Sequence, residues 1–197
     1  VSELPSKMLF VRKYFILHGE KNPRTIYKVN NRQPVLHGNF LGTDYLFYAF
    51  SDDGVRVFVN NNSVIDNWAN ATNRVLYGTR GLNQGQNQIR VEYFESTGDA
   101  RIAVGWQQVV KNAWIGEYYT NGSLGEPPLY IQQDNSINFT SWGTGSPGGL
   151  PSDNFSIRWF RNYDFGNAAL YRFTVTVDDG VRLRVGSGTI IDQWNSA

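Results

Sequence analysis

Apolar and polar residues alternate with a period of two in several short runs of this 197-residue chain. In "VRLRV" at 181–185, the apolar side chains fall on one face and the two arginines on the other, as in a strand with one buried face. The runs "YLFYAFS" at 45–51 and "YRFTVTV" at 171–177 alternate in the same way. Further strands are predicted at 88–95, 100–106, 114–119, 136–142 and 155–165.

The chain repeats itself after 126 residues. Residues 45–68 align with 171–194 without a gap, and eleven of the 24 positions are identical. Because an internal repeat fixes the number of structural units, two related units are expected. Each copy reads as a strand, an Asp-Asp-Gly turn, a second strand, a further turn and a third strand. We expect Gly54 and Gly180 to supply the positive φ that tight reversals need.

Composition supports an all-β fold. The chain holds 12 Phe, 11 Tyr, 6 Trp and 20 Gly, and it shows no long amphipathic helical pattern. The absence of cysteine excludes disulfides and thiolate sites from these residues. The most apolar run, "MLFVRKYFIL" at 8–17, is interrupted by Arg12 and Lys13, so no membrane insertion is expected. A start without Met or a signal peptide fits a processed product or a part of a longer chain.

The net charge of +1 is unevenly distributed. Residues 1–44 hold seven Lys and Arg against three acids, whereas residues 45–197 hold eleven against fourteen. The basic segment is therefore expected either to dock on the acidic remainder, within or between chains, or to be a solvated arm. Because the overall charge is near zero and the basic residues form no recognisable motif, nucleic-acid binding is not expected.

Two parts of the chain, 45–109 and 113–197, resemble the PA-fourteen (PA14) domain, which is named for the anthrax protective antigen. The resemblance rests on five motifs, "WIGEYYTNGSLGEPP", "SINFTSWGTGSP", "SDNFSIRW", "IRVEYFESTGDARIAVGW" and the two "DDGVR" hairpins with "IDNW" or "IDQW". This family is a β-sandwich found in bacterial surface proteins, glycosidases, toxins and yeast adhesins. The resemblance therefore implies an antiparallel β-sandwich for each part.

Neither part contains the whole family pattern. Residues 45–109 resemble its second half, and 113–197 resemble its first half and central hairpin; residues 1–44 are expected to provide first strands or donated strands. A sandwich without its remaining strands exposes an apolar face and unpaired backbone groups. Three completions remain open: strand exchange between the half-units inside the chain, strand donation between subunits, or the chain being a fragment of a longer array.

The Asp-Asp-Gly turns are the candidate metal sites. In adhesin members of the family, the two aspartates are joined by a cis peptide and hold a calcium ion that binds sugar hydroxyls. The resemblance therefore implies Ca²⁺ at Asp52 and Asp53 and at Asp178 and Asp179. Calcium takes six to eight oxygens, so another loop must contribute ligands. The alternative interpretation is that both dipeptides only make hairpin turns.

No catalytic constellation is recognisable. His18 and His37 are isolated, and the glycines at 143–148 are not followed by a helix that could bind phosphate. The six tryptophans are expected to pack in the core, with Trp142 in the loop-like "SWGTGSPGG" as the weakest case.

We therefore expect a non-catalytic, extracellular or cell-surface bacterial protein. Its modules are expected to self-associate head-to-tail into a fibre by β-strand complementation. The alternative is a calcium-dependent carbohydrate-binding module that takes a glycan as its partner. The lack of cysteine is compatible with a bacterial surface protein of this size.

Overall fold

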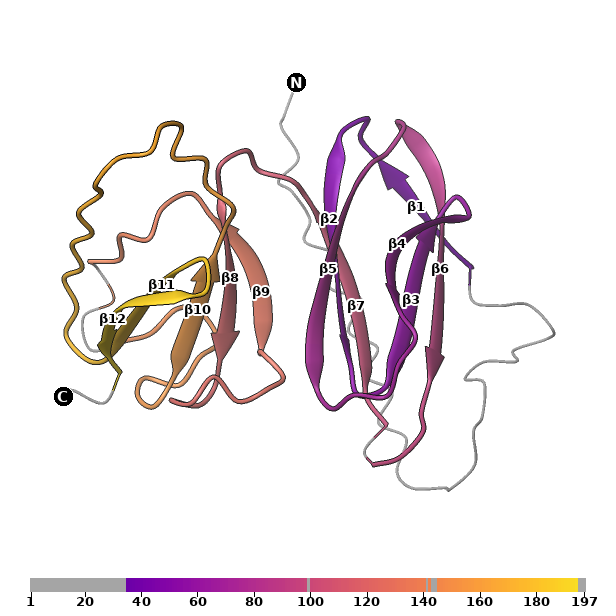
Figure 1. The fold of residues 1–197 in the computed structure, drawn as a ribbon. Helices are drawn as coiled ribbons and strands as arrows, with labels where there is room; N and C mark the ends of the chain where they lie inside the picture. The colour runs from indigo at the N-terminus through magenta and orange to yellow at the C-terminus, as the bar shows by residue number, and fades with distance from the viewer. Residues whose placement is uncertain (1–34, 99, 141, 143–144, 195–197) are drawn as a thin grey trace. The chain divides into compact units, whose positions relative to one another are not determined.

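The computed structural model describes residues 35–98, 100–140, 142 and 145–194, and for 35–39 it describes the backbone only. The described residues form strands and no helix, which confirms the all-β prediction (Figure 1). The basic segment 1–44 and the apolar run at 8–17 lie largely outside these residues, except that 35–40 form the first strand. No helix among the described residues is long and apolar enough to cross a bilayer.

Twelve strands are present in the described part of the chain. They are β1 (Val35–Phe40), β2 (Asp44–Ser51), β3 (Gly54–Val59), β4 (Asn62–Asn67), β5 (Arg74–Gly81), β6 (Gly85–Phe94), β7 (Ile102–Gln108), β8 (Trp114–Tyr119), β9 (Tyr130–Asp134), β10 (Ser156–Phe160), β11 (Val181–Val185) and β12 (Gly188–Gln193). The chain divides into two compact units, with the boundary in the sequence between Arg161 and Asn162.

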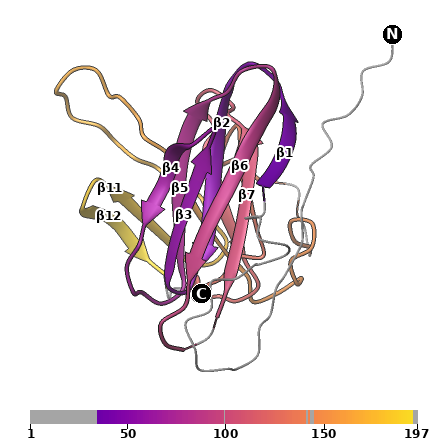
Figure 2. The same ribbon diagram turned by 90° about the vertical axis from the view of Figure 1, so that its right-hand side faces the viewer.

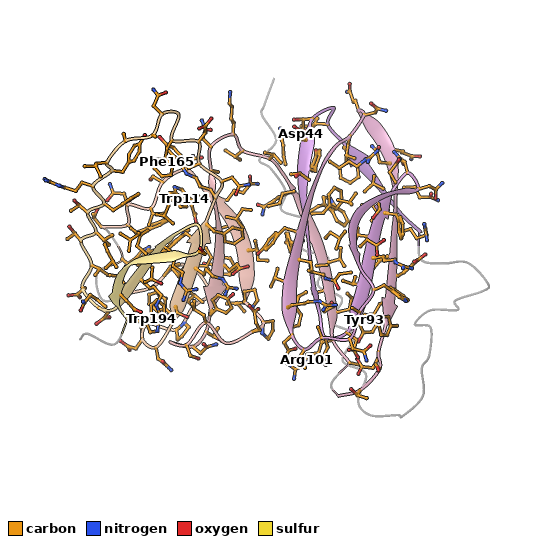
Figure 3. All side chains as sticks on the ribbon, in the orientation of Figure 1. Asp44, Tyr93, Arg101, Trp114, Phe165 and Trp194 are labelled. Carbon is orange, nitrogen blue, oxygen red and sulfur yellow. The ribbon has the colours of Figure 1, made fainter. Side chains whose placement is uncertain are left out.

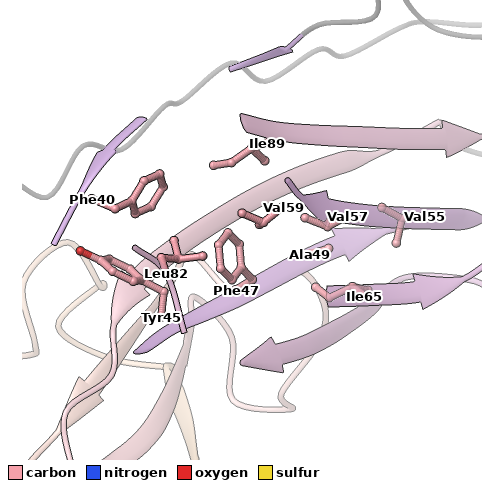
Figure 4. Packing of buried hydrophobic residues seen from close by; sticks show 10 residues of the cluster. All are labelled: Phe40, Tyr45, Phe47, Ala49, Val55, Val57, Val59, Ile65, Leu82 and Ile89. Carbon is pink, nitrogen blue, oxygen red and sulfur yellow. The ribbon is translucent and has the colours of Figure 1, made fainter. Parts of the chain in front are cut away.

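The first unit contains a β-sandwich built from β1 to β7. One sheet has the order β1-β6-β3-β4 and the other β5-β2-β7, and every pair is antiparallel (Figure 2). The alternation that predicts strand 45–51 places Phe47 and Ala49 fully inside, where they meet Val55 and Val57 from the facing sheet (Figure 4). Burying one such aliphatic or aromatic side chain contributes about 1.5–3 kcal/mol, so this core holds the sandwich together.

The first unit also contains a sheet of order β10-β8-β9. Tyr118 of β8 is fully buried and stacks on Tyr130 of β9, with ring centroids 4.5 Å apart. Trp142 stacks on Phe139 at 4.8 Å, so this tryptophan packs on a neighbouring ring. The strand predicted at 136–142 is not formed at 136–140, because those residues make no ladder with a neighbouring strand.

The second unit consists of one hairpin, β11-β12, and loops. The strand predicted at 171–177 is not formed, although its sequence matches that of β2. In the first copy, β2 is hydrogen-bonded on both sides, by β5 and β7; the described residues of the second unit hold no counterparts of these strands. Val175 is consequently 42% exposed, whereas Ala49 at the matching position is fully buried.

Candidate functional site

Asp52 and Asp53, here called the acidic turn, connect β2 to β3 and are only 4% and 3% exposed. Asp53 accepts three backbone N–H hydrogen bonds: Oδ1 from Ala71 (3.2 Å), and Oδ2 from Ser96 (2.6 Å) and Thr97 (3.2 Å). Asp52 Oδ1 accepts a fourth, from the N–H of Asn73 (3.1 Å). The acidic turn thus fastens the β4–β5 and β6–β7 loops to the same end of the sandwich.

Neighbouring groups hold the turn itself in place. Ser51 Oγ donates to the carbonyl of Asp53 (2.9 Å), and Arg74 Nη2 donates to the same carbonyl (3.0 Å) and to that of Ala69 (2.9 Å). On the other side, the N–H of Asp52 donates to the carbonyl of Arg101 (3.0 Å). The carbonyls of Asp53, Ala69 and Arg101 are therefore all engaged, as buried polar groups usually are.

Gly54 and Gly180 are required in the two turns for a different reason from the one expected. Neither Gly54 nor Gly180 has a positive φ, so the prediction of a left-handed turn residue is wrong. A Cβ on Gly54 would instead overlap the ring of Phe94, and one on Gly180 would overlap the backbone of Trp194. Close approach of a neighbouring group, rather than backbone conformation, excludes a side chain at both positions.

A third carboxyl, Glu95, lies against the acidic turn. Burial raises its pKa, and the nearby charges of Asp53 and Asp52 raise it further, while a hydrogen bond from Tyr93 OH (2.8 Å) lowers it. Figure 3 shows Tyr93 and Arg101 at this end of the sandwich, where the N–H of Arg101 donates to Tyr93 OH (3.1 Å). Glu95 Oε1 and Asn73 Oδ1 are both buried without a hydrogen-bond partner among the described residues.

Hydrogen bonds already engage much of the acidic turn. Three N–H donors occupy about three of the four lone-pair directions of the Asp53 carboxylate, which leaves little of it for a metal. The peptide bond between Asp52 and Asp53 is trans. Within the described ranges, no three His, Asp or Glu side chains are grouped to hold an ion. The geometry matches a structural anchor, and calcium at this turn stays a prediction.

The second acidic pair is placed differently. Asp178 and Asp179 are both exposed, and the structure brings no counterpart of the two anchored loops to them in the part of the chain that it describes. The repeated sequence therefore produces a buried anchor in the first copy and a solvent-facing bend in the second.

What both copies do share is a cross-strand clamp on the hairpin. Arg56 Nε contacts Asp66 Oδ1 at 2.9 Å, and Arg182 Nε contacts Asp192 Oδ1 at the same distance. The guanidinium also lies over a tryptophan ring, at 4.5 Å for Arg56 over Trp68 and at 5.6 Å in the second copy. Trp68 is 42% exposed, so its predicted place in the core is wrong; it covers the outer face of the sheet, against Phe94.

A second buried carboxylate, which the sequence patterns did not indicate, lies in β8. Glu117 is 2% exposed and accepts hydrogen bonds from Tyr77 OH of β5, Tyr119 OH (2.8 Å) and Arg158 Nε of β10. Burial and this carboxylate raise the pKa of Tyr77 far above its ordinary value. The signal in the sequence is an acid inside the apolar run "WIGEYY", where an unpaired charge would not be tolerated.

Comparison with known proteins supports the resemblance drawn from the motifs. The family model described as "PA14 domain" matches residues 42–110 and again 110–197. The chain is 27% identical over 176 residues to the anti-sigma-I factor RsgI3 of Acetivibrio thermocellus, covering 77% of the chain and 27% of that protein. The chain thus spans about a quarter of the length of this relative.

Two solved structures are also similar. One is an anti-sigma factor domain-containing protein, 23% identical with a TM-score of 0.35, covering 82% of this chain and 64% of that one. The other, from Clostridium clariflavum, carries the same description; it is 24% identical with a TM-score of 0.35, covering 81% and 64%.

Proposed function

Because the chain belongs to the PA14 domain family, we propose that it is a non-catalytic ligand-binding region of a bacterial cell-surface regulator and that its ligand is a carbohydrate. In this proposal the region faces the outside of the cell and reports the presence of a polysaccharide without altering it. The regulator is of the anti-sigma-factor type.

The observation that carries the proposal is the extent of the likeness to RsgI3. The alignment covers 77% of this chain, which is more than either PA14 segment, 42–110 or 110–197, could supply alone. The aligned part of RsgI3 therefore matches residues from both PA14 segments of this chain, and it lies inside one longer chain whose name is that of an anti-sigma factor. A regulator needs a part that receives a signal, and the two segments are the candidates for it.

The carbohydrate part of the proposal rests on the family resemblance and on the loop end of the first sandwich. Binding loops need a rigid support, and the acidic turn provides one for the loops that contain Asn70 and Ser96. Asn70 Nδ2 donates to Ser96 Oγ (3.1 Å) across the two loops, and the hydrogen bond is exposed. Amide and hydroxyl groups of this kind are able to exchange hydrogen bonds with sugar hydroxyls.

A glycan array with and without Ca²⁺ tests the proposal. We expect the chain to bind a subset of polysaccharides, and expect Asn70→Ala and Ser96→Ala to weaken binding while the fold survives, since both are exposed loop residues. Asp153→Ala, at an exposed loop residue of the second PA14 segment, is the matched control and should bind like wild type. Silence of the array in both conditions counts against carbohydrate as the ligand; loss on chelation supports the calcium-dependent form.

A second candidate function is assembly by strand complementation. It is favoured by the apolar side chains that the second unit exposes at positions equivalent to buried ones in the first, such as Val175 and Val185, which match Ala49 and Val59. A neighbouring chain could cover these residues by donating strands. Sedimentation velocity over a hundredfold concentration range tests this candidate: growth into long oligomers is expected, and a strict monomer contradicts it.

A further inference from the structure

We infer that the first PA14 segment and the β8–β9–β10 sheet of the second are joined by the buried Glu117 carboxylate, so that the first sandwich and this sheet move as one body. This inference goes beyond the proposed function, because it does not depend on which ligand binds or on whether one does. Both parts lie within the first compact unit.

The fastening is made by donors from both PA14 segments. Tyr77 belongs to β5, inside the segment 42–110, whereas Glu117 and Arg158 belong to β8 and β10 of the segment 110–197. Tyr77 OH and Arg158 Nε both donate to Glu117. Arg158 Nη2 additionally donates to Glu126 Oε1 (3.0 Å), so the guanidinium is held in place by two carboxylates.

The carboxylate depends on these donors because it is almost completely removed from water. Glu117 is 2% exposed, and a buried charge is stable only when it is paired and hydrogen-bonded. One of its donors comes from the other segment. Separating the two segments would therefore take Tyr77 away from a buried charge, which opposes the separation.

Side-chain packing and the connecting residues add to the fastening. The ring of Tyr77 packs edge-on against Phe160 of β10, with centroids 5.3 Å apart. Gln133 of β9 accepts from the N–H of Val110 (2.8 Å) and donates to the carbonyl of Gln108 (2.7 Å), so a side chain of the second segment binds the last residues of the first. The junction between the segments is thus held by side chains at more than one point.

The chain suits a direct measurement, because it has no cysteine and two can be introduced for spin labels. Asn61→Cys lies in the exposed β3–β4 turn of the first sandwich, and Ser152→Cys lies in an exposed loop of the second segment. Pulsed dipolar spectroscopy then gives the distribution of distances between the labels. We expect a single narrow distribution in the wild-type chain.

Two variants each remove one tyrosine hydroxyl that donates to Glu117. They distinguish a hydrogen bond that joins the two segments from one within a single segment. Tyr77→Phe removes the donor that comes from the other segment and is expected to broaden the distribution at least twofold. Tyr119→Phe removes a donor from β8, the strand that carries Glu117 itself, and is expected to leave the width unchanged. A broad wild-type distribution, or a Tyr77→Phe distribution as narrow as wild type, overturns the inference.

Circular dichroism checks that each variant is folded. If Tyr77→Phe fails to fold, Gln133→Ala takes its place, because it removes only the two junction hydrogen bonds at a partly exposed side chain. It is expected to broaden the distribution by a smaller factor, and an unchanged width then counts against the inference. If the wild-type chain binds no glycan but shows a narrow distribution of label distances, the proposed function is contradicted and this inference is not.

Discussion

Replacing Asp53 by asparagine tests whether the acidic turn is a structural anchor. The substitution keeps size and shape but puts an NH₂ group where a carboxylate oxygen was. In the more favourable of the two amide orientations, the NH₂ group faces the N–H of Ala71. The amide oxygen still accepts from the N–H groups of Ser96 and Thr97, but it carries no negative charge. One partly buried donor is left unpaired and two bonds lose their charge assistance.

The cost follows from these three bonds. An unpaired buried donor costs about 1–3 kcal/mol, and a hydrogen bond to a charged group exceeds a neutral one by about 1 kcal/mol. Because the N–H of Ala71 is only partly buried, its loss falls at the lower end of this range, and together with the two weakened bonds we expect Asp53→Asn to destabilise the first sandwich by about 3 kcal/mol. Amide hydrogen exchange of β2 and β3 reports the stability of this sandwich alone, and 3 kcal/mol corresponds to exchange roughly a hundredfold faster.

The second copy of the repeat provides the matched control. Asp179→Asn makes the same change at an exposed aspartate, where we expect an effect below about 0.5 kcal/mol. Equal effects at the two positions, or a threefold or smaller acceleration for Asp53→Asn, would refute the assignment of the acidic turn as an anchor.

Three further changes test other parts of the structure. Gly54→Ala places a methyl group against the ring of Phe94 and should lower thermal stability by about 1–3 kcal/mol, whereas Gly148→Ala, with open space around it, should not. Burial raises the pKa of Glu126, so its protonated form favours the folded state; stability from this source is present at low pH and is lost as the pH rises through the raised pKa. Glu126→Gln removes the buried charge that is present at pH 7.5, so it should raise the Tm at pH 7.5 and leave it unchanged at pH 3.5. An equal change in Tm at the two pH values would contradict a raised pKa of Glu126. Val177→Ser, at a half-exposed position, should change the unfolding free energy by less than about 0.5 kcal/mol in denaturant titrations, whereas a loss of several kcal/mol would show that the side chain is buried in solution.

The sequence predicted the hairpins because they are local. Alternation in "VRLRV" and the short turns "NNNS" and "GSG" depend on neighbouring residues, and the β3–β4 and β11–β12 hairpins form as predicted. Asp52 and Asp53 do not make the predicted hairpin turn, because they connect β2 and β3, which lie in different sheets. β11 pairs with β12 although the described residues of the second unit contain no other strand. Residues 171–177 alternate equally well but form no strand, since a strand also needs partners, and the pattern of one segment says nothing of whether its partners are present.

The contacts that define the site could not be predicted from the sequence, because they join residues that are far apart in the chain. Asp53 was singled out as a metal ligand, but its partners Ser96 and Thr97 lie 43 and 44 residues away and bind through backbone N–H groups, which every residue except proline has. Glu117 was missed because its donor Tyr77 is 40 residues away in another strand. Only the fold brings such groups together.

We propose that the first PA14 segment binds carbohydrate through the loops that the acidic turn supports. Affinity electrophoresis in gels containing soluble polysaccharides measures this directly, with wild type, Asn70→Ala and Asp153→Ala in adjacent lanes. We expect at least one polysaccharide to retard wild type and Asp153→Ala but not Asn70→Ala. Equal migration of all three proteins in every gel would contradict it.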